Sequence, residues 1–259
     1  DDSLALTSTL WLFDLDNTLH DASHAAFPHL HMAMADYVAT ELGVSADEAS
    51  ALRQHYWLRY GATLLGLVRH HGVRAAHFLE KTHRMPGLEQ RLRTSAHDRA
   101  ALAALPGRKF ILTNAPRDYA MRVLRELRLA RIPDDQGRVR YAFPDVGGNE
   151  GVITIEDMAM FGALRPKPDA RMLRRIAVRL RVPPARCVLV EDTLSHLKAA
   201  RSVGMRGVWM ERYLDGRFRG HFRDAVNAGS RPERGPRRCP KPAYLYAKIG
   251  AIRTLLRTR

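Results

Sequence analysis

The chain has 259 residues, 46% of them hydrophobic, which is enough for one core, or for one core with a small accessory domain. No stretch approaches about 18 consecutive apolar residues, so no transmembrane helix is expected, and the acidic opening does not resemble a secretory signal. Cys187 and Cys239 form neither a metal-ligand spacing nor a disulfide framework, which makes the reducing cytoplasm the expected compartment.

The formal net charge of +15 is uneven along the chain. The segment from Glu211 to Arg259 carries 13 Lys and Arg against 4 Asp and Glu, a balance of +9, which leaves +6 for the first 210 residues. Such a segment could attract nucleic acid or an anionic surface, but we favour a solvated arginine-rich extension. A basic body also suits an enzyme whose substrates are anions.

The N-terminal half is predicted to hold two strands separated by helices. Leu10–Asp14 is a short apolar run typical of a buried strand. Residues 22–105 space their apolar side chains by three and four with glycine breaks, so we expect about four helices and no strand there. Lys109–Thr113 is the second predicted strand, and an amphipathic helix follows it. Ile132–Gly151 is rich in Gly, Pro and Asp and predicts an irregular segment.

The C-terminal half continues the alternation. Gly151–Met158 is strand-like, Pro168-Asp169 begins a predicted helix, and the run CVLV at 187–190 predicts another strand. A helix, a short strand before Glu211 and a helical segment at Ala243–Leu256 complete the prediction.

This order of elements predicts an α/β fold. Strands that alternate with helices form right-handed βαβ units and a parallel sheet. The helical block after the first strand is too long for a crossover, so it is expected to be an inserted domain. We therefore predict a Rossmann-like parallel-sheet core in residues 1–20 and 106–214, a helical-bundle cap domain in residues 21–105, and a basic C-terminal extension in residues 215–259.

Polar side chains stand where the predicted strands end, which is where open α/β sheets place their chemistry. Each one alone has an ordinary explanation as a cap, a turn or an exposed charge. Several sets in order on one sheet edge are harder to explain that way. The sets are Asp14 and Asp16, Thr113 and Asn114, Lys167 between two prolines, and Glu191 with Asp192.

This combination of side chains suits phosphoryl transfer. Carboxylates from two strands, Asp14 and Asp192, could hold a hard divalent cation such as Mg²⁺. Lys167 would offset the negative charge of the acids, and Thr113 could hold phosphoryl oxygens. One carboxylate can attack phosphorus to form an acyl-phosphate, and a second can protonate the leaving alcohol and then activate water.

The motifs DLDNTL, LTNA, RPKP and LVEDT occur in the order of the four motifs of the haloacid dehalogenase-like (HAD) hydrolase superfamily, and the resemblance covers roughly Trp11–Met210. Such a resemblance implies catalytic roles for Asp14 as nucleophile and Asp16 as general acid/base. It also implies that Thr113, Asn114 and Lys167 bind the phosphoryl group. Metal ligands would be Asp14, the backbone carbonyl of Asp16, Glu191 and Asp192, with Asp192 in the more direct contact.

The acid at position 16 narrows the kind of enzyme that the resemblance implies. Dehalogenase members of the superfamily lack an acid at this position, and ion-pumping ATPases carry a threonine there. The resemblance therefore favours a phosphatase or phosphomutase.

Further segments resemble the bacterial and fungal pyrimidine 5′-nucleotidase branch. Its helical cap carries a Tyr-Gly-x-Thr-x-x-Gly-Leu segment, which here spans residues 60–67. This segment either contacts the substrate, with Tyr60 as the candidate, or uses its glycines to let two cap helices pack closely. The chain departs from the branch at His20, where Tyr or Phe is usual, and at His196, where Asn is usual. His20 is a candidate substrate contact, with a solvent-facing side chain as the alternative.

The resemblance implies a Mg²⁺-dependent phosphatase that hydrolyses pyrimidine nucleoside 5′-monophosphates through an aspartyl-phosphate, as a monomer or dimer with no membrane partner. Arg117 could reach the leaving group, although a surface position at a helix start is the alternative we favour. The same chemistry could act on phosphoglycolate or a sugar phosphate, or serve a phosphomutase. A second alternative, suggested by the basic extension, is a nucleic-acid-binding protein on a phosphatase-like scaffold.

Overall fold

The computed structural model describes residues 9–93, 95–129, 132–133, 139–140, 143, 151–213 and 241–257. Cys239, most of the irregular segment 132–151 and residues 215–240 of the basic extension lie outside the described residues. Among the described residues, no helix is long and apolar enough to cross a membrane.

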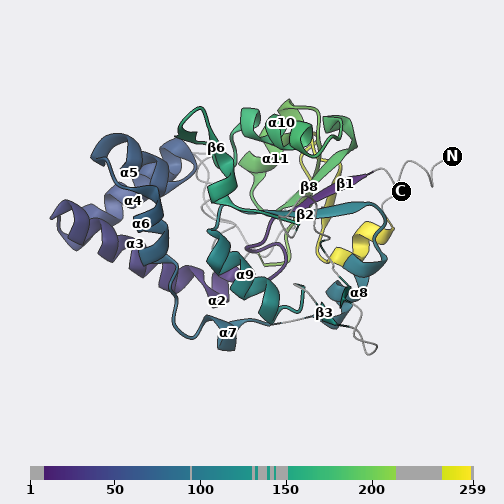
Figure 1. Cartoon of the computed structure of the whole chain (residues 1–259), viewed down its shortest axis with the longest axis horizontal. Coiled ribbons are helices and arrows are strands. Elements are labelled where there is room, and N and C mark those ends of the chain that lie inside the picture. The colour runs from purple at the N-terminus through teal and green to yellow at the C-terminus, as the bar shows by residue number, and fades with distance from the viewer. Residues whose placement is uncertain are drawn as a thin grey trace, which may run out of the picture.

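A parallel six-stranded sheet forms the centre of the molecule (Figure 1). Its strand order is β10-β9-β8-β1-β2-β5. The strands are β1 (Leu10–Phe13), β2 (Arg108–Leu112), β5 (Val152–Ile153), β8 (Cys187–Glu191), β9 (Arg206–Met210) and β10 (Ala247–Ile249). The predicted α/β fold with a Rossmann-like parallel sheet is confirmed.

Alternate side chains of each strand enter different cores, as the period of two along a strand requires. Leu10 and Leu12 of β1 join a cluster with helices α10 (Ala170–Arg179) and α11 (Leu194–Ser202). Trp11 and Phe13 join the opposite cluster, which includes side chains of α9 (Arg117–Glu126) and α8 (Ala96–Ala104). Figure 1 shows α10 and α11 on one face of the sheet and α9 on the other. The sheet is therefore buried on both faces.

The helical block between β1 and β2 contains more helices than the four predicted. They are α2 (Ala22–Ala25), α3 (Phe27–Leu42), α4 (Ala46–Tyr60), α5 (Thr63–His71), α6 (Ala75–Thr82), α7 (Leu88–Arg91) and α8. Left-handed glycines at Gly43, Gly61 and Gly72 end α3, α4 and α5 and divide the block into shorter pieces.

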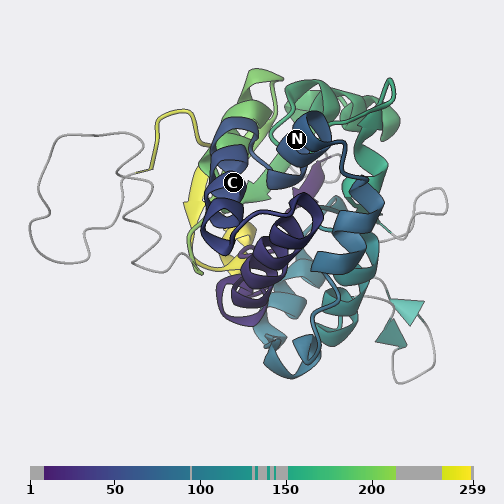
Figure 2. The same cartoon turned by 90° about the vertical axis from the view of Figure 1, so that its left-hand side faces the viewer.

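Helices α3 to α6 enclose a core of their own, which includes Tyr37, Tyr56, Leu67 and Phe78. Figure 2 shows these cap helices in front of the sheet. By contrast, α2, α7 and α8 contribute side chains to the cluster that contains Trp11, Phe13 and side chains of α9, which we call the sheet-side cluster. The domain boundaries given above stay a prediction.

Four segments differ from the prediction. The stretch predicted to be helical at Ala243–Leu256 forms strand β10 and a 3₁₀ helix at Ile252–Leu256, because β10 pairs with the otherwise open edge of β9. Only Val152–Ile153 of the strand-like segment is a strand, since the Thr154 capping box begins a 3₁₀ helix at Ile155–Met158. Two short hairpins are also present, β3 (Ile132–Pro133) with β4 (Val139–Arg140) and β6 (Ala159–Met160) with β7 (Ala163–Leu164).

The glycines of the 60–67 segment serve packing. A Cβ atom added to Gly66 would lie 2.0 Å from Cγ of Tyr56, so α5 contacts α4 at a distance that only glycine permits. Gly61, at φ +77°, brings the end of α4 against the core, where an added Cβ would lie 2.9 Å from Cδ of Pro168. The cap therefore meets the core beside Lys167.

Replacing Gly66 by alanine is expected to lower the free energy of unfolding by about 2 kcal/mol or more, because the methyl group overlaps the buried Tyr56 ring. This loss should outweigh the better helix propensity of alanine, about 1 kcal/mol. Urea denaturation measures the difference. Gly250→Ala is the control, since an added Cβ meets nothing within 4 Å there. A Gly66→Ala variant as stable as the wild type would contradict this account of the packing.

His83, at the end of α6, joins the cap to α9. Its ring lies edge-on to Tyr119 with centroids 5.7 Å apart, and Nδ1 donates to the Leu79 carbonyl at 3.1 Å. Burial lowers the pKa of His83 from 6.5 to about 4. The folded protein therefore holds this ring neutral over a pH range in which the unfolded chain protonates it.

Below pH 6.5 the unfolded state binds the extra proton, so the contribution of His83 to stability is expected to fall by about 3 kcal/mol as pH drops towards 4. Urea denaturation at a series of pH values, compared between wild type and His83→Gln, isolates this contribution. The slope of stability against pH should be shallower in the variant, and unchanged in the exposed-site control His97→Gln. Equal slopes in all three proteins would refute it.

Candidate active site

The loop after β1 is closed by its own side chains. Asn17 adopts a left-handed conformation (φ 56°), which asparagine tolerates better than most residues. Its Oδ1 accepts from the Ser23 N–H and its Nδ2 donates to Ser23 Oγ, each at 2.9 Å. Asp21 then accepts from the His24 N–H at the start of α2. The strand ends at Phe13, and the turn at Asn17 holds Asp14 and Asp16 in a fixed loop.

Lys167 lies between two carboxylates from neighbouring strands. Its Nζ is 2.6 Å from Asp14 Oδ1 and 2.6 Å from Glu191 Oε2, and all three side chains are buried. Asn114 holds the backbone of Lys167, because its Oδ1 accepts from the Lys167 N–H and its Nδ2 donates to the Lys167 carbonyl, both at 2.9 Å. Both polar ends of the Asn114 side chain thus bond the Lys167 backbone, and the substrate contact predicted for Asn114 stays a prediction.

The acidic groups around Lys167 perturb one another. Burial and the charge of Glu191 together raise the pKa of Asp14 to about 8, although Lys167 acts in the opposite direction. Burial alone would raise the pKa of Glu191, but Lys167 and the nearby His196 hold it below its usual range. Burial, Glu191 and Asp14 together hold the pKa of Asp192 well above its usual range. One ammonium therefore does not balance the three carboxylates.

These three carboxylates fit a divalent cation. One oxygen each from Asp14, Glu191 and Asp192 lie within 4.8 Å of one another, and hard cations such as Mg²⁺ prefer oxygen ligands. A cation there would relieve the repulsion that raises the pKa of Asp192. The side chain of Asp16 is not in this cluster, and the prediction assigned only its backbone carbonyl to the metal.

The remaining predicted residues have definite surroundings. Thr113 is buried at the end of β2, where its Oγ1 accepts from the Ala115 N–H at 3.0 Å, and its hydroxyl hydrogen can still donate. His20 does not face solvent, because its ring is buried and contacts Asp16 Oδ1 through Nε2 at 2.8 Å, and its role as a substrate contact stays a prediction.

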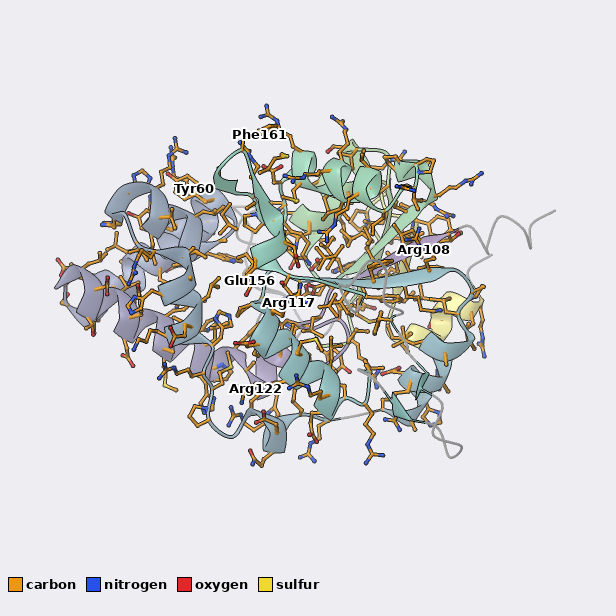
Figure 3. All side chains as sticks on the ribbon, in the orientation of Figure 1. Tyr60, Arg108, Arg117, Arg122, Glu156 and Phe161 are labelled. Atoms are coloured by element: carbon orange, nitrogen blue, oxygen red, sulfur yellow. The ribbon has the colours of Figure 1, made fainter. Side chains whose placement is uncertain are left out.

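Two residues outside the strand ends, Tyr60 and Arg117, make contacts with neighbouring side chains. The Tyr60 hydroxyl lies 2.6 Å from His70 Nε2, and the guanidinium groups of Arg59 and Arg69 lie over its ring. The Arg117 guanidinium donates to Asp157 at 2.7 Å, and its backbone N–H donates to Glu156 at 3.0 Å. Figure 3 shows Arg117 beside Glu156 at the start of α9, and Tyr60 out on the cap.

The sequence interpretation missed three contributors to the site. Tyr119 donates its hydroxyl to Asp16 Oδ1 at 2.7 Å, Thr18 Oγ1 donates to Asp14 Oδ2 at 3.3 Å, and His196 Nδ1 lies 3.1 Å from Glu191 Oε2. Thr18 belongs to the first motif, so its position in the sequence could have indicated that it lies at the site. Tyr119 falls on the buried face of an amphipathic helix, where nothing local distinguishes it from a core residue.

The parallel sheet brings a buried carboxylate, a lysine and an acidic pair together at the carboxyl ends of its strands, next to the helical cap. This arrangement suits a hydrolase that uses a carboxylate. A family model described as haloacid dehalogenase-like hydrolase matches residues 10–204. The chain belongs to this family.

Solved structures share the fold at low sequence identity. A HAD phosphatase from Thermococcus onnurineus is 20% identical with a TM-score of 0.53, and the match covers 96% of both chains. A HAD-like protein of unknown function from Agrobacterium tumefaciens is 17% identical with a TM-score of 0.52, also over 96% of both chains. A magnesium-bound HAD hydrolase from Bacillus subtilis is 15% identical with a TM-score of 0.52, over 96% of this chain and 97% of that one.

Replacing Asp192 by asparagine is expected to weaken Mg²⁺ binding by about tenfold or more, because a neutral amide replaces one of three clustered carboxylates. Isothermal titration calorimetry with Mg²⁺ alone measures this without any substrate. Asp47→Asn, on an exposed cap helix, is the matched control. Unchanged Mg²⁺ affinity in Asp192→Asn would exclude this carboxylate as a ligand.

Proposed function

We propose that the protein is a Mg²⁺-dependent phosphatase that hydrolyses nucleoside 5′-monophosphates, with pyrimidine nucleotides preferred. The observation that carries the proposal is the pairing of Asp14 and Asp16. Asp14 is buried against Lys167, whereas the side chain of Asp16, two residues on, is 20% exposed and bonded away from that cluster. The two carboxylates therefore have separate environments, as a nucleophile and an acid/base require.

The proposed reaction has two steps. A carboxylate oxygen of Asp14 attacks phosphorus, and the bond to the 5′-oxygen breaks as Asp16 donates a proton to that oxygen. Asp16, now ionised, takes a proton from water, which attacks the aspartyl-phosphate and releases inorganic phosphate with Asp14 restored. Lys167 and Thr113 hold phosphoryl oxygens through both steps.

A bound Mg²⁺, held by Asp14, Asp192 and the backbone carbonyl of Asp16, would neutralise negative charge at the phosphoryl group. Glu191 is engaged by Lys167, so its main contribution is to fix the ammonium.

The nucleotide substrate is supported by the resemblance of residues 60–67 to the nucleotidase cap and by the place of that segment. Gly61 contacts Pro168, so the end of α4 borders the loop that carries Lys167. A cap segment beside the phosphoryl site is suited to selecting the group attached to the phosphate and to excluding water.

A different small phosphate ester, such as phosphoglycolate or a sugar phosphate, is the second candidate. The observation that favours this candidate is the surroundings of Tyr60, whose hydroxyl bonds His70 and whose ring contacts Arg59 and Arg69. The Tyr60 ring would have to give up these contacts before it could stack on a nucleotide base.

A panel of phosphate esters with Mg²⁺, and with EDTA as control, tests the substrate class. We expect UMP, CMP or dTMP to have the highest kcat/KM, with no turnover in EDTA. Faster hydrolysis of phosphoglycolate or a sugar phosphate than of any nucleotide would overturn the nucleotidase assignment and leave the phosphatase chemistry in place.

Asp14→Asn is expected to abolish turnover, by about 10³-fold or more in kcat, because the amide oxygen cannot replace the carboxylate as nucleophile. The fold should persist, which circular dichroism checks, and Asp47→Asn should retain wild-type activity. Substantial residual turnover in Asp14→Asn would rule out Asp14 as the nucleophile.

A further inference from the structure

Asp16 receives two hydrogen-bond donors on one oxygen. The Tyr119 hydroxyl donates to Oδ1 at 2.7 Å, and His20 Nε2 lies 2.8 Å from the same atom. The two donors come from different parts of the fold, because Tyr119 is in the first turn of α9 and His20 is in the loop after β1. No described residue bonds Oδ2 of Asp16.

Both donors are rigidly placed. The Tyr119 residue is 2% exposed and the His20 residue 1% exposed, so neither side chain can turn away without disturbing the core. Tyr119 packs in the sheet-side cluster with Val123 and Leu124, and the His83 ring lies against the Tyr119 ring in a T-shaped arrangement. A carboxylate held by two fixed donors keeps one orientation about both side-chain torsions.

The surroundings of His20 define which of its nitrogens donates. Nδ1 is buried and has no hydrogen-bond partner among the described residues, so a proton there would be left unsatisfied. The neutral ring with its proton on Nε2 satisfies the contact to Asp16, whose carboxylate can only accept. The Tyr119 hydroxyl carries one proton, which it donates to the same Oδ1 atom at 2.7 Å.

We propose that His20 and Tyr119 are positioning residues for the general acid/base: by fixing Oδ1 of Asp16 they present Oδ2 to the leaving oxygen and then to the attacking water. This inference rests on the proposed phosphatase function.

Loss of this positioning should affect the two chemical steps differently. Formation of the aspartyl-phosphate needs a proton from Asp16 when the leaving group is an alkoxide, but not when it is p-nitrophenolate, which leaves unprotonated. Hydrolysis of the aspartyl-phosphate needs Asp16 as base whatever the substrate was. A misplaced Asp16 therefore slows both steps for an alkyl ester but only the second step for p-nitrophenyl phosphate.

The test compares Tyr119→Phe, His20→Phe and His20→Gln with wild type, on p-nitrophenyl phosphate and on the best alkyl phosphate of the panel. In Tyr119→Phe and His20→Phe we expect kcat for the alkyl ester to fall by about 10- to 100-fold with little change in KM. On p-nitrophenyl phosphate both variants should show a burst of p-nitrophenolate and accumulate phosphoenzyme, trapped by acid quench. His20→Gln, whose amide can donate from near the Nε2 position, should retain most of the activity.

Tyr37→Phe is the matched control, because Tyr37 is also a buried tyrosine hydrogen-bonded to a histidine, His77, but lies in the cap core. A double variant, Asp16→Asn with Tyr119→Phe, should be no slower than Asp16→Asn alone if Tyr119 acts through Asp16. Thermal melts show whether each variant is folded.

The outcomes separate this inference from the function on which it rests. Three results would each overturn the positioning role and leave the phosphatase function intact. They are equal losses on both substrates without a burst, wild-type rates in Tyr119→Phe and His20→Phe, and additive losses in the double variant. A wild-type protein that hydrolyses no phosphate ester would overturn the proposed function, and the positioning role with it.

Discussion

The buried ammonium of Lys167 is the interaction on which the rest of the site depends. A carboxylate buried without a partner is costly, and here Asp14 and Glu191 are both removed from water within hydrogen-bond distance of one lysine. The lysine allows β1 and β8 to end in acids side by side. Without it, the two strands could not carry buried charges at this edge of the sheet.

The loop that carries Lys167 is bonded to the sheet core and also contacts the cap. Asn114, at the end of β2, bonds its backbone on both sides of the residue. Pro168, the next residue, lies against Gly61 of the cap. The ammonium is therefore positioned by the ends of β1, β2 and β8, and it lies beside a contact between cap and core.

Local patterns predicted the strand ends well, because the information lies in a few consecutive residues. An apolar run followed by a carboxylate or a Thr-Asn pair marks β1, β2 and β8 to within a residue. The same reasoning could not find Tyr119, which meets Asp16 across 103 residues of sequence and only because α9 packs beneath the sheet. Nor could it find β10, whose conformation depends on an open neighbouring edge that the local sequence does not encode.

The return of the chain to the sheet at β10 changes what the basic segment is. Its described flanks are β9 on one side and residues 241–257 on the other, and β10 pairs with β9 while Ile252 and Leu255 are buried in the main core. The described end of the basic segment is therefore part of the core of the molecule. Truncation of the chain before residue 241 would remove β10 together with the buried side chains of Ile252 and Leu255, and would leave the outer edge of β9 without a partner strand.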